Sequence, residues 1–115
     1  MSYQTAKREL DRVFSLYIRK RDPKCACCGR PAEVCGHFIP RGKLATRWDE
    51  DNCFGWCEDC NTLEPDTRND PRWREIHVSI VGENVRRDLE EQARKGGKYS
   101  EAELRDMIKY YRGRI

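Results

Sequence analysis

Seven cysteines stand out in this chain of 115 residues, and four of them fall into two Cys-x-x-Cys pairs about thirty residues apart. The pairs are Cys25 with Cys28 and Cys57 with Cys60. Four thiolates supplied in this way bind one zinc ion tetrahedrally and leave no open position for catalysis. The spacing therefore predicts a closed structural zinc site formed by these four residues.

The remaining cysteines and one histidine leave alternatives for this site. Cys25 and Cys27 are a conceivable pair, and Cys35 or His37 could replace one of the four thiolates. A free cysteine otherwise behaves as a small apolar residue. We expect Cys27, Cys35 and Cys53 to be semi-buried residues of this kind.

A histidine and two asparagines lie within or beside the segment that the cysteine pairs bound. His37 is followed by Asn52 after 15 positions and by Asn61 after 9 more. A single histidine on a short strand is more often structural than catalytic, but an imidazole that titrates near neutrality suits proton transfer. Asn61 directly follows Cys60, a ligand of the predicted zinc site.

Three motifs resemble the NinG/Rap recombination endonucleases of lambda-like phages. They are Gly36-His37, the run from Trp48 to Asn52, and Cys57-x-x-Cys60-Asn61. The core is also similar to the HNH, or ββα-metal, nuclease superfamily in its His-Asn-Asn form with a four-cysteine zinc site. The resemblance covers nearly the whole chain, although the longer basic N-terminal region of that family is missing. It implies a phage- or prophage-encoded protein in the cytoplasm of a bacterial host.

Carried over position by position, the resemblance implies a metal-dependent endonuclease. His37 would be the general base that takes a proton from the attacking water. Asn61 would offer its amide oxygen to a catalytic Mg²⁺ or Mn²⁺. Asn52 would brace the hairpin loop by hydrogen bonds from its side chain to the backbone. The side chains expected to bind phosphates are Arg41, Lys43 and Arg47.

One position departs from many HNH enzymes, which carry an aspartate as second metal ligand just before the histidine. Gly36 occupies that position here, as it does in NinG-like sequences. The second protein ligand could then be a backbone carbonyl or a carboxylate such as Glu50 or Asp51, with His77 a remoter candidate. We expect His77 to lie on a helix surface instead.

Composition and charge limit the class of protein. A hydrophobic fraction of 37% and an equal charged fraction favour one small domain that a metal helps to stabilise. The chain has no membrane-spanning apolar run and no signal peptide, so we expect a reducing compartment and free or metal-bound thiols. Residues 1–47 carry a net charge of +7 and the remainder −4, which suits contact of the N-terminal half with DNA phosphates.

The periodicity predicts an α+β fold in one domain, divided into a basic helical segment 1–24, a zinc-bound core 25–64 and a helical extension 65–115. A helix is expected from residue 3 to about 21, with Arg19 and Lys20 on a basic face that could contact DNA. In the core we expect a cysteine knuckle, a strand over 34–39, a polar loop over 40–51, a strand over 52–56 and a helix beginning near residue 58. A turn-rich stretch over 64–71 should precede a helix after Pro71, although Ile76, Val78 and Ile80 would also fit a strand. Two further helices are expected, one that stops at Gly96-Gly97 and one capped by Ser100 and Glu103.

The preferred interpretation is a metal-dependent endonuclease acting on branched recombination DNA such as Holliday junctions or D-loops. Structural zinc, catalytic Mg²⁺ or Mn²⁺ and a two-fold homodimer would accompany that activity. A zinc-ribbon DNA-binding module without catalysis is the alternative from another class. An HNH nickase or packaging nuclease without preference for branches is the third.

Overall fold

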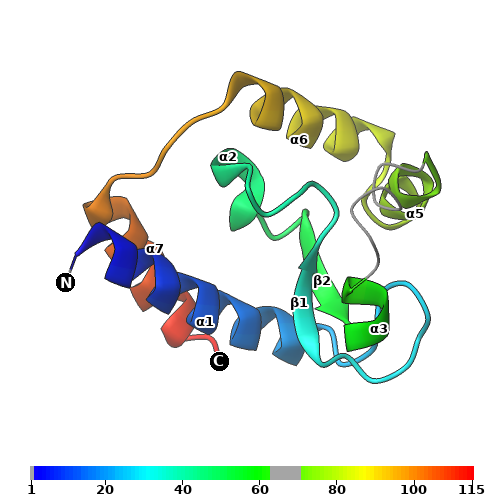
Figure 1. Ribbon diagram of the computed structural model, residues 1–115, viewed down its shortest axis with the longest axis horizontal. Helices are drawn as coiled ribbons and strands as arrows, with labels where there is room; N and C mark the ends of the chain where they lie inside the picture. Colours follow the sequence, from blue (N-terminus) through cyan, green and yellow to red (C-terminus); the bar gives the residue numbers. More distant parts are fainter. Residues whose placement is uncertain (1, 63–70) are drawn as a thin grey trace.

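The computed structural model describes residues 2–62 and 71–115, and its fold is α+β, as predicted. The elements are α1 (Tyr3–Arg21), β1 (Val34–His37), α2 (Leu44–Arg47), β2 (Cys53–Trp56), α3 (Glu58–Asn61), α5 (Pro71–Val81), α6 (Glu83–Lys95) and α7 (Glu101–Arg112). The hairpin of β1 and β2 lies between two groups of helices (Figure 1). Helices α1 and α7 flank it on one side, and α5 and α6 on the other.

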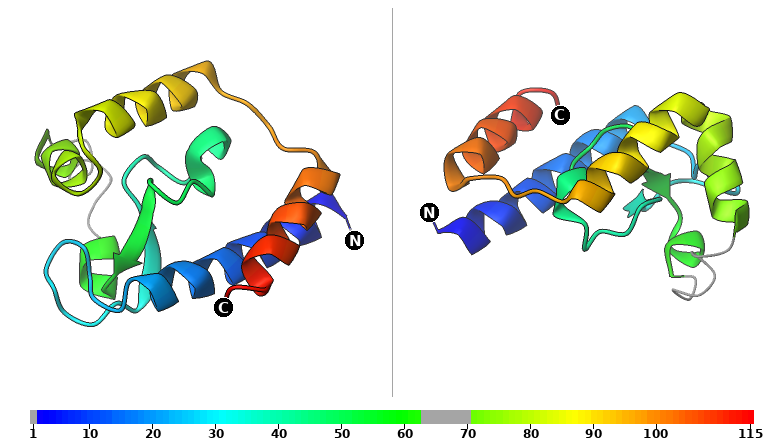
Figure 2. Two further views of the ribbon diagram at one scale, coloured as in Figure 1. Left: turned by 180° about the vertical axis from the view of Figure 1, so that it is seen from behind. Right: turned by 90° about the horizontal axis from the view of Figure 1, so that it is seen from above.

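Helix α1 forms because one apolar face repeats at helical spacing. Leu10, Val13, Phe14 and Ile18 are all buried. The Ser2 side chain caps the first turn by accepting a hydrogen bond from the backbone N–H of Thr5. The buried face packs against α7, and the two helices lie side by side in every view (Figure 2).

The hairpin presents two different faces because side chains alternate along a strand. Its strands pair antiparallel, with Val34 opposite Trp56 and His37 opposite Cys53. Cys35 and His37 therefore share one face with Cys53. Gly36 lies on the other face, where an ideal Cβ would come within 2.3 Å of the Trp56 indole.

The buried side chains form two apolar clusters rather than one. The first holds the buried face of α1, the buried face of α7, Trp48 and Cys53. The second consists of Cys25, Phe38, Trp56, Cys57 and Trp73. The second cluster thus contains two of the four expected zinc ligands, and it joins the hairpin to α5.

The C-terminal helices follow their predicted limits. Helix α6 ends at Gly96, whose φ of 77° is the left-handed conformation that favours glycine. Helix α7 begins with the predicted capping box, in which Ser100 and Glu103 bond each other's backbone N–H groups. Within the described residues, none of the helices has the length and apolar character that crossing a membrane requires.

Two expectations about the connecting segments need correction or cannot be placed. The polar loop expected over 40–51 contains a short helix, α2, whose N-cap residue Lys43 makes no capping hydrogen bond with its side chain. Because such a helix has neither a cap nor a full apolar repeat, the sequence does not reveal it. The turn-rich stretch and the domain subdivision near residue 65 fall almost entirely on residues 63–70, outside the described part of the chain.

Candidate metal and catalytic site

The four cysteines of the predicted zinc site converge. Cys25 and Cys28 lie in a tight knuckle, closed by hydrogen bonds between the Cys25 N–H and the Arg30 carbonyl and between the Gly29 N–H and the Cys25 carbonyl. The second pair, Cys57 and Cys60, spans the end of β2 and the start of α3. All four sulfur atoms lie within 4.8 Å of one another. The sulfurs of Cys28 and Cys57 are 3.6 Å apart, close to the separation of about 3.8 Å that tetrahedral zinc–thiolate geometry requires.

Positive charge favours the thiolate form of Cys28. Arg30 Nε lies 3.4 Å from Cys28 Sγ, and its Nη2 lies 3.7 Å from Cys57 Sγ. The hydrogen bond from Arg30 is the main reason why the pKa of Cys28 falls to about 6. The backbone N–H of Cys60 also donates to Cys57 Sγ. The chemistry of this donor set fits zinc.

The other three cysteines stay outside this group. Burial raises the pKa of Cys27 to about 12, and its sulfur is not among the four that converge. Cys53 is fully buried, which corrects the expectation of a semi-buried residue. Cys35 and His37, considered as substitutes for one zinc thiolate, form a separate group with Cys53.

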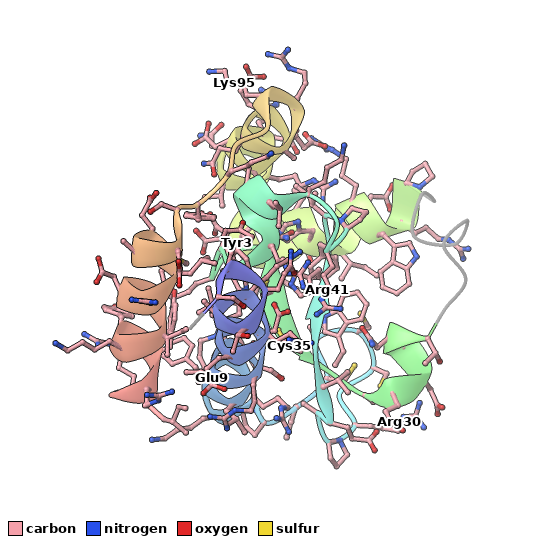
Figure 3. All side chains as sticks on the ribbon, turned by 60° about the vertical axis from the view of Figure 1, so that its left-hand side comes forward. Tyr3, Glu9, Arg30, Cys35, Arg41 and Lys95 are labelled. Atoms are coloured by element: carbon pink, nitrogen blue, oxygen red, sulfur yellow. The ribbon has the colours of Figure 1, made fainter. Side chains whose placement is uncertain are left out.

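A second site lies on the other side of the hairpin, where α1 passes β1 and α3. A pocket of about 380 Å³ there brings His37 and Asn61 together. Its lining also includes Arg19, Arg41, Asp11 and Glu33. Figure 3 shows Cys35 and Arg41 in the space between α1 and the hairpin, with Arg30 near α3. Four of the residues expected to act on a phosphodiester therefore share one concave surface, namely Arg19, His37, Arg41 and Asn61.

The imidazole of His37 has a defined orientation. Its Nε2 donates a hydrogen bond of 2.8 Å to the carbonyl oxygen of Arg47. Because a carbonyl only accepts, the neutral ring carries its proton on Nε2, and Nδ1 keeps its lone pair. Burial is the main reason why the pKa of His37 falls to about 4, against the opposing effect of the Arg47 carbonyl. The ring is therefore neutral at neutral pH.

Asn52 braces the loop that carries this carbonyl. Its Oδ1 accepts from the Ile39 N–H at 2.8 Å. Its Nδ2 donates to the carbonyls of Ile39 and Thr46 at 3.1 and 3.0 Å. The side chain is completely buried, and the expected hydrogen bonding between side chain and backbone is present. Thr46 immediately precedes Arg47, so the brace also fixes the partner of His37.

Comparison with protein families matches residues 2–115 to the family described as Bacteriophage Lambda NinG protein. The chain belongs to the NinG family. Comparison with curated proteins and with solved structures gives no match. Family membership and the four-cysteine group agree with the motifs that suggested them.

The basic residues expected to contact DNA are distributed unevenly in this NinG-family protein. Arg19 and Arg41 line the pocket, whereas exposed Lys43 lines a different pocket beside α5 and α6. Lys20 is exposed and lies outside both pockets. The guanidinium of Arg47 is held inside the protein, with its side chain only 10% exposed and 2.6 Å from Asp11. Arg47 thus fixes α1 to the loop.

The candidates for a second metal ligand lie elsewhere. Glu50 accepts hydrogen bonds from the hydroxyls of Tyr17 and Tyr111 at 2.6 and 3.2 Å. The backbone carbonyl of Asp51 accepts from His77 Nε2. Neither acid lines the pocket. His77 itself is buried, which corrects its expected place on a helix surface.

Two carboxylates that do line the pocket were missed by sequence reasoning. Burial alone would raise the pKa of Asp11, but hydrogen bonds from Arg47 and Trp48 hold it below its usual value. Glu33 is exposed and accepts a hydrogen bond from the N–H of Glu58. Asp11 is an acid on an otherwise basic helix face, and this contrast was the available clue. Glu33 offered no local clue, because the pocket that it lines exists only where α1 packs against β1.

Proposed function

We propose that this NinG-family protein is a metal-dependent endonuclease of the HNH type that cuts branched recombination DNA. The observation that carries the proposal is the pocket in which His37 and Asn61 meet Arg19 and Arg41. General base, amide ligand and phosphate-binding cations are the groups that phosphodiester hydrolysis requires.

In this mechanism His37 accepts a proton from the attacking water through Nδ1. The hydrogen bond from Nε2 to the Arg47 carbonyl orients the ring and stabilises the imidazolium that forms. The cost of burying that cation also makes the imidazole return its proton readily, so the base is restored after each cycle.

Oxygen donors at the pocket fit a hard divalent ion. Asn61 would supply an amide oxygen, and Glu33 would be the better carboxylate ligand, because Asp11 is already bound to Arg41, Arg47 and Trp48. Mg²⁺ or Mn²⁺ bound by these residues would stabilise charge on the phosphate and on the leaving oxygen. Gly36 contributes no ligand, since a side chain there would overlap Trp56.

Branched DNA is the expected substrate class, by resemblance to the recombination endonucleases of lambda-like phages. Arg19, Lys20 and Arg41 would contact its phosphates, consistent with the basic N-terminal half. Resolution of a four-way junction takes two opposed cuts, so the active form would be a two-fold dimer.

The test is cleavage of a labelled four-way junction in Mg²⁺ or Mn²⁺ by zinc-loaded protein. His37→Gln keeps a donor for the Arg47 carbonyl but has no base, so we expect a rate lowered by roughly 10²–10⁴-fold with binding retained. Glu33→Gln should also lower the rate, whereas Glu75→Gln, at an exposed position on α5, should not. Equal cutting by wild type and His37→Gln would remove His37 from its role.

Gly36 also favours a second candidate, a zinc-stabilised DNA-binding module without catalysis. Junction binding by wild type with no cutting in either ion would establish that alternative. A linear duplex of the same sequence is the third arm. Cutting it as fast as the junction would indicate a nuclease without branch preference.

A further inference from the structure

Three soft or borderline metal donors converge on the pocket face of the hairpin, away from the four-cysteine group. They are Cys35 and His37 on β1 and Cys53 on β2. One sulfur from each cysteine and one ring nitrogen of His37 lie within 4.8 Å of one another. The strand register produces this arrangement, because Cys35 and His37 are two positions apart and Cys53 pairs directly with His37.

The hydrogen bonding of His37 resembles that of a metal ligand. A ligating histidine usually donates its second ring N–H to a carbonyl or carboxylate, which fixes the tautomer and the ring orientation. His37 Nε2 donates to the Arg47 carbonyl and leaves Nδ1 available. The thiol of Cys53 donates to the same carbonyl at 3.3 Å, a contact it would give up on binding metal as a thiolate.

An ion can reach these donors through the pocket. Cys35 and His37 both line it and are only half-buried, while Cys53 forms the buried end of the group. Two sulfurs and one nitrogen match the ligands that zinc prefers, and a fourth position would face the pocket.

We propose that Cys35, His37 and Cys53 form a second metal site, which binds zinc or another thiophilic divalent ion separately from the four-cysteine site. The donors must close to about 3.8 Å, and only three are protein ligands, so this site binds more weakly than the first. If the proposed nuclease function holds, an ion here occupies the imidazole that acts as base. Zinc then inhibits cleavage.

The test adds Co²⁺ to reduced, zinc-loaded protein and follows the near-ultraviolet band of a cobalt–thiolate bond. Wild type should take up one equivalent with this band. Cys35→Ala, at a half-buried position, should lower the affinity at least tenfold, and Cys27→Ala is the matched control that should retain it. Retained zinc and an unchanged circular dichroism spectrum show that each variant is folded.

Two results would overturn the second site. One is the absence of the band in wild type, and the other is an equal band in wild type and Cys35→Ala, which would indicate exchange into the four-cysteine site.

A second arm separates this site from the proposed nuclease. For each protein, the rate of Mg²⁺-dependent junction cleavage with added zinc is divided by the rate without it. This ratio should be well below one in wild type and Cys27→Ala, and close to one in Cys35→Ala. A cobalt band without any cleavage would support the metal site and contradict the nuclease, whereas cleavage without a band would do the reverse.

Discussion

Asn52 is the residue on which the geometry of the hairpin loop most depends. Its three hydrogen bonds reach both sides of the loop, and its side chain is completely buried. Removing the amide leaves an N–H and two carbonyls without this partner in a buried place. We expect Asn52→Ala to lower the free energy of unfolding by roughly 2–4 kcal/mol, measured by urea denaturation.

The matched control is Asn84→Ala, at an exposed position in α6. It should change the free energy of unfolding by less than about 0.5 kcal/mol. An equal loss at both positions would contradict the bracing role of Asn52.

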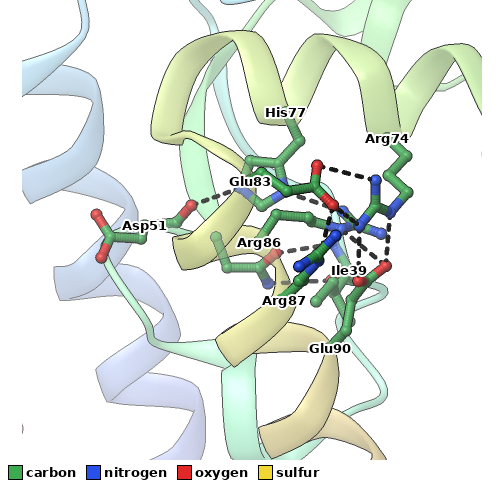
Figure 4. A network of polar contacts seen from close by, with 9 residues as sticks. Ile39, Asp51, Arg74, His77, Glu83, Arg86, Arg87 and Glu90 are labelled. Atoms are coloured by element: carbon green, nitrogen blue, oxygen red, sulfur yellow. Dashed lines mark hydrogen bonds and ion pairs between the residues drawn. The ribbon is translucent and has the colours of Figure 1, made fainter.

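The buried side chain of His77 links α5 to the same loop through a network of polar contacts (Figure 4). Its Nε2 donates to the Asp51 carbonyl at 2.6 Å, and its Nδ1 accepts from Arg86 at 2.9 Å. The ring also stacks on Phe38, with centroids 4.4 Å apart. Both ring nitrogens are thus engaged by the neutral form, and a proton on Nδ1 would face a guanidinium.

This arrangement gives His77 a pH-dependent contribution to stability. Burial is the main reason why its pKa falls below the ordinary value, and the charge of Arg86 adds to the effect. Because the pKa of His77 is lower in the folded state than in the unfolded state, its contribution to the free energy of unfolding is fully present above about pH 6.5. That contribution is lost as the pH falls through the folded-state pKa. Arg86 also lies 3.2 Å from Glu90, whose charge acts in the opposite direction.

We therefore expect wild type to lose its stability advantage over His77→Gln as the pH is lowered below 6.5. The measurement is the difference in unfolding free energy between the two proteins across that range. Acid release of zinc affects both proteins and cancels in the difference. A difference that stays constant with pH would contradict the neutral role of His77.

At the scale of elements, the hairpin depends on a glycine at position 36. A Cβ there would lie 2.3 Å from the Trp56 indole, which is completely buried. We expect Gly36→Ala to lower the melting temperature and to cost at least about 1–3 kcal/mol through overpacking. Gly42→Ala, where a Cβ would meet nothing within 4 Å, is the control and should change stability little. Similar effects at both glycines would show that Trp56 moves aside without cost.

The elements differ in how far the sequence predicts them. The limits of α1 and α7 follow from local information, namely the apolar repeat in α1 and the Ser100–Glu103 box in α7. The cysteine spacing likewise predicts the four-sulfur group. The pocket is different, because it exists only where α1 passes the hairpin, so the roles of Asp11 and Glu33 depend on tertiary contacts. The prediction that His77 lies on a helix surface was wrong for the same reason, since its hydrogen-bond partner Asp51 is distant in sequence.

At the scale of the whole molecule, zinc should hold the second apolar cluster together. Cys25 and Cys57 belong to both the metal group and this cluster, where Trp56 stacks on Trp73 at 5.4 Å. Zinc binding in small domains contributes on the order of 10 kcal/mol, comparable with the total stability of a domain. A strong chelator should therefore abolish the near-ultraviolet circular dichroism of the stacked tryptophans. The same chelator saturated with zinc should leave this signal intact. An unchanged spectrum after loss of zinc would refute the role of zinc in holding the second apolar cluster together.

The pairing of α1 with α7 joins two segments that lie far apart in the sequence. Phe14 and Tyr17 of α1 contact Tyr111 of α7, with ring centroids 4.9 and 4.8 Å from it. On a ribosome, α1 leaves the exit tunnel long before its partner is made. At about 5–20 residues per second, its apolar face waits on the order of ten seconds for α7. Nascent chains should therefore attract chaperones through α1, and the synthesis of α7 sets the earliest moment at which these two helices can pair.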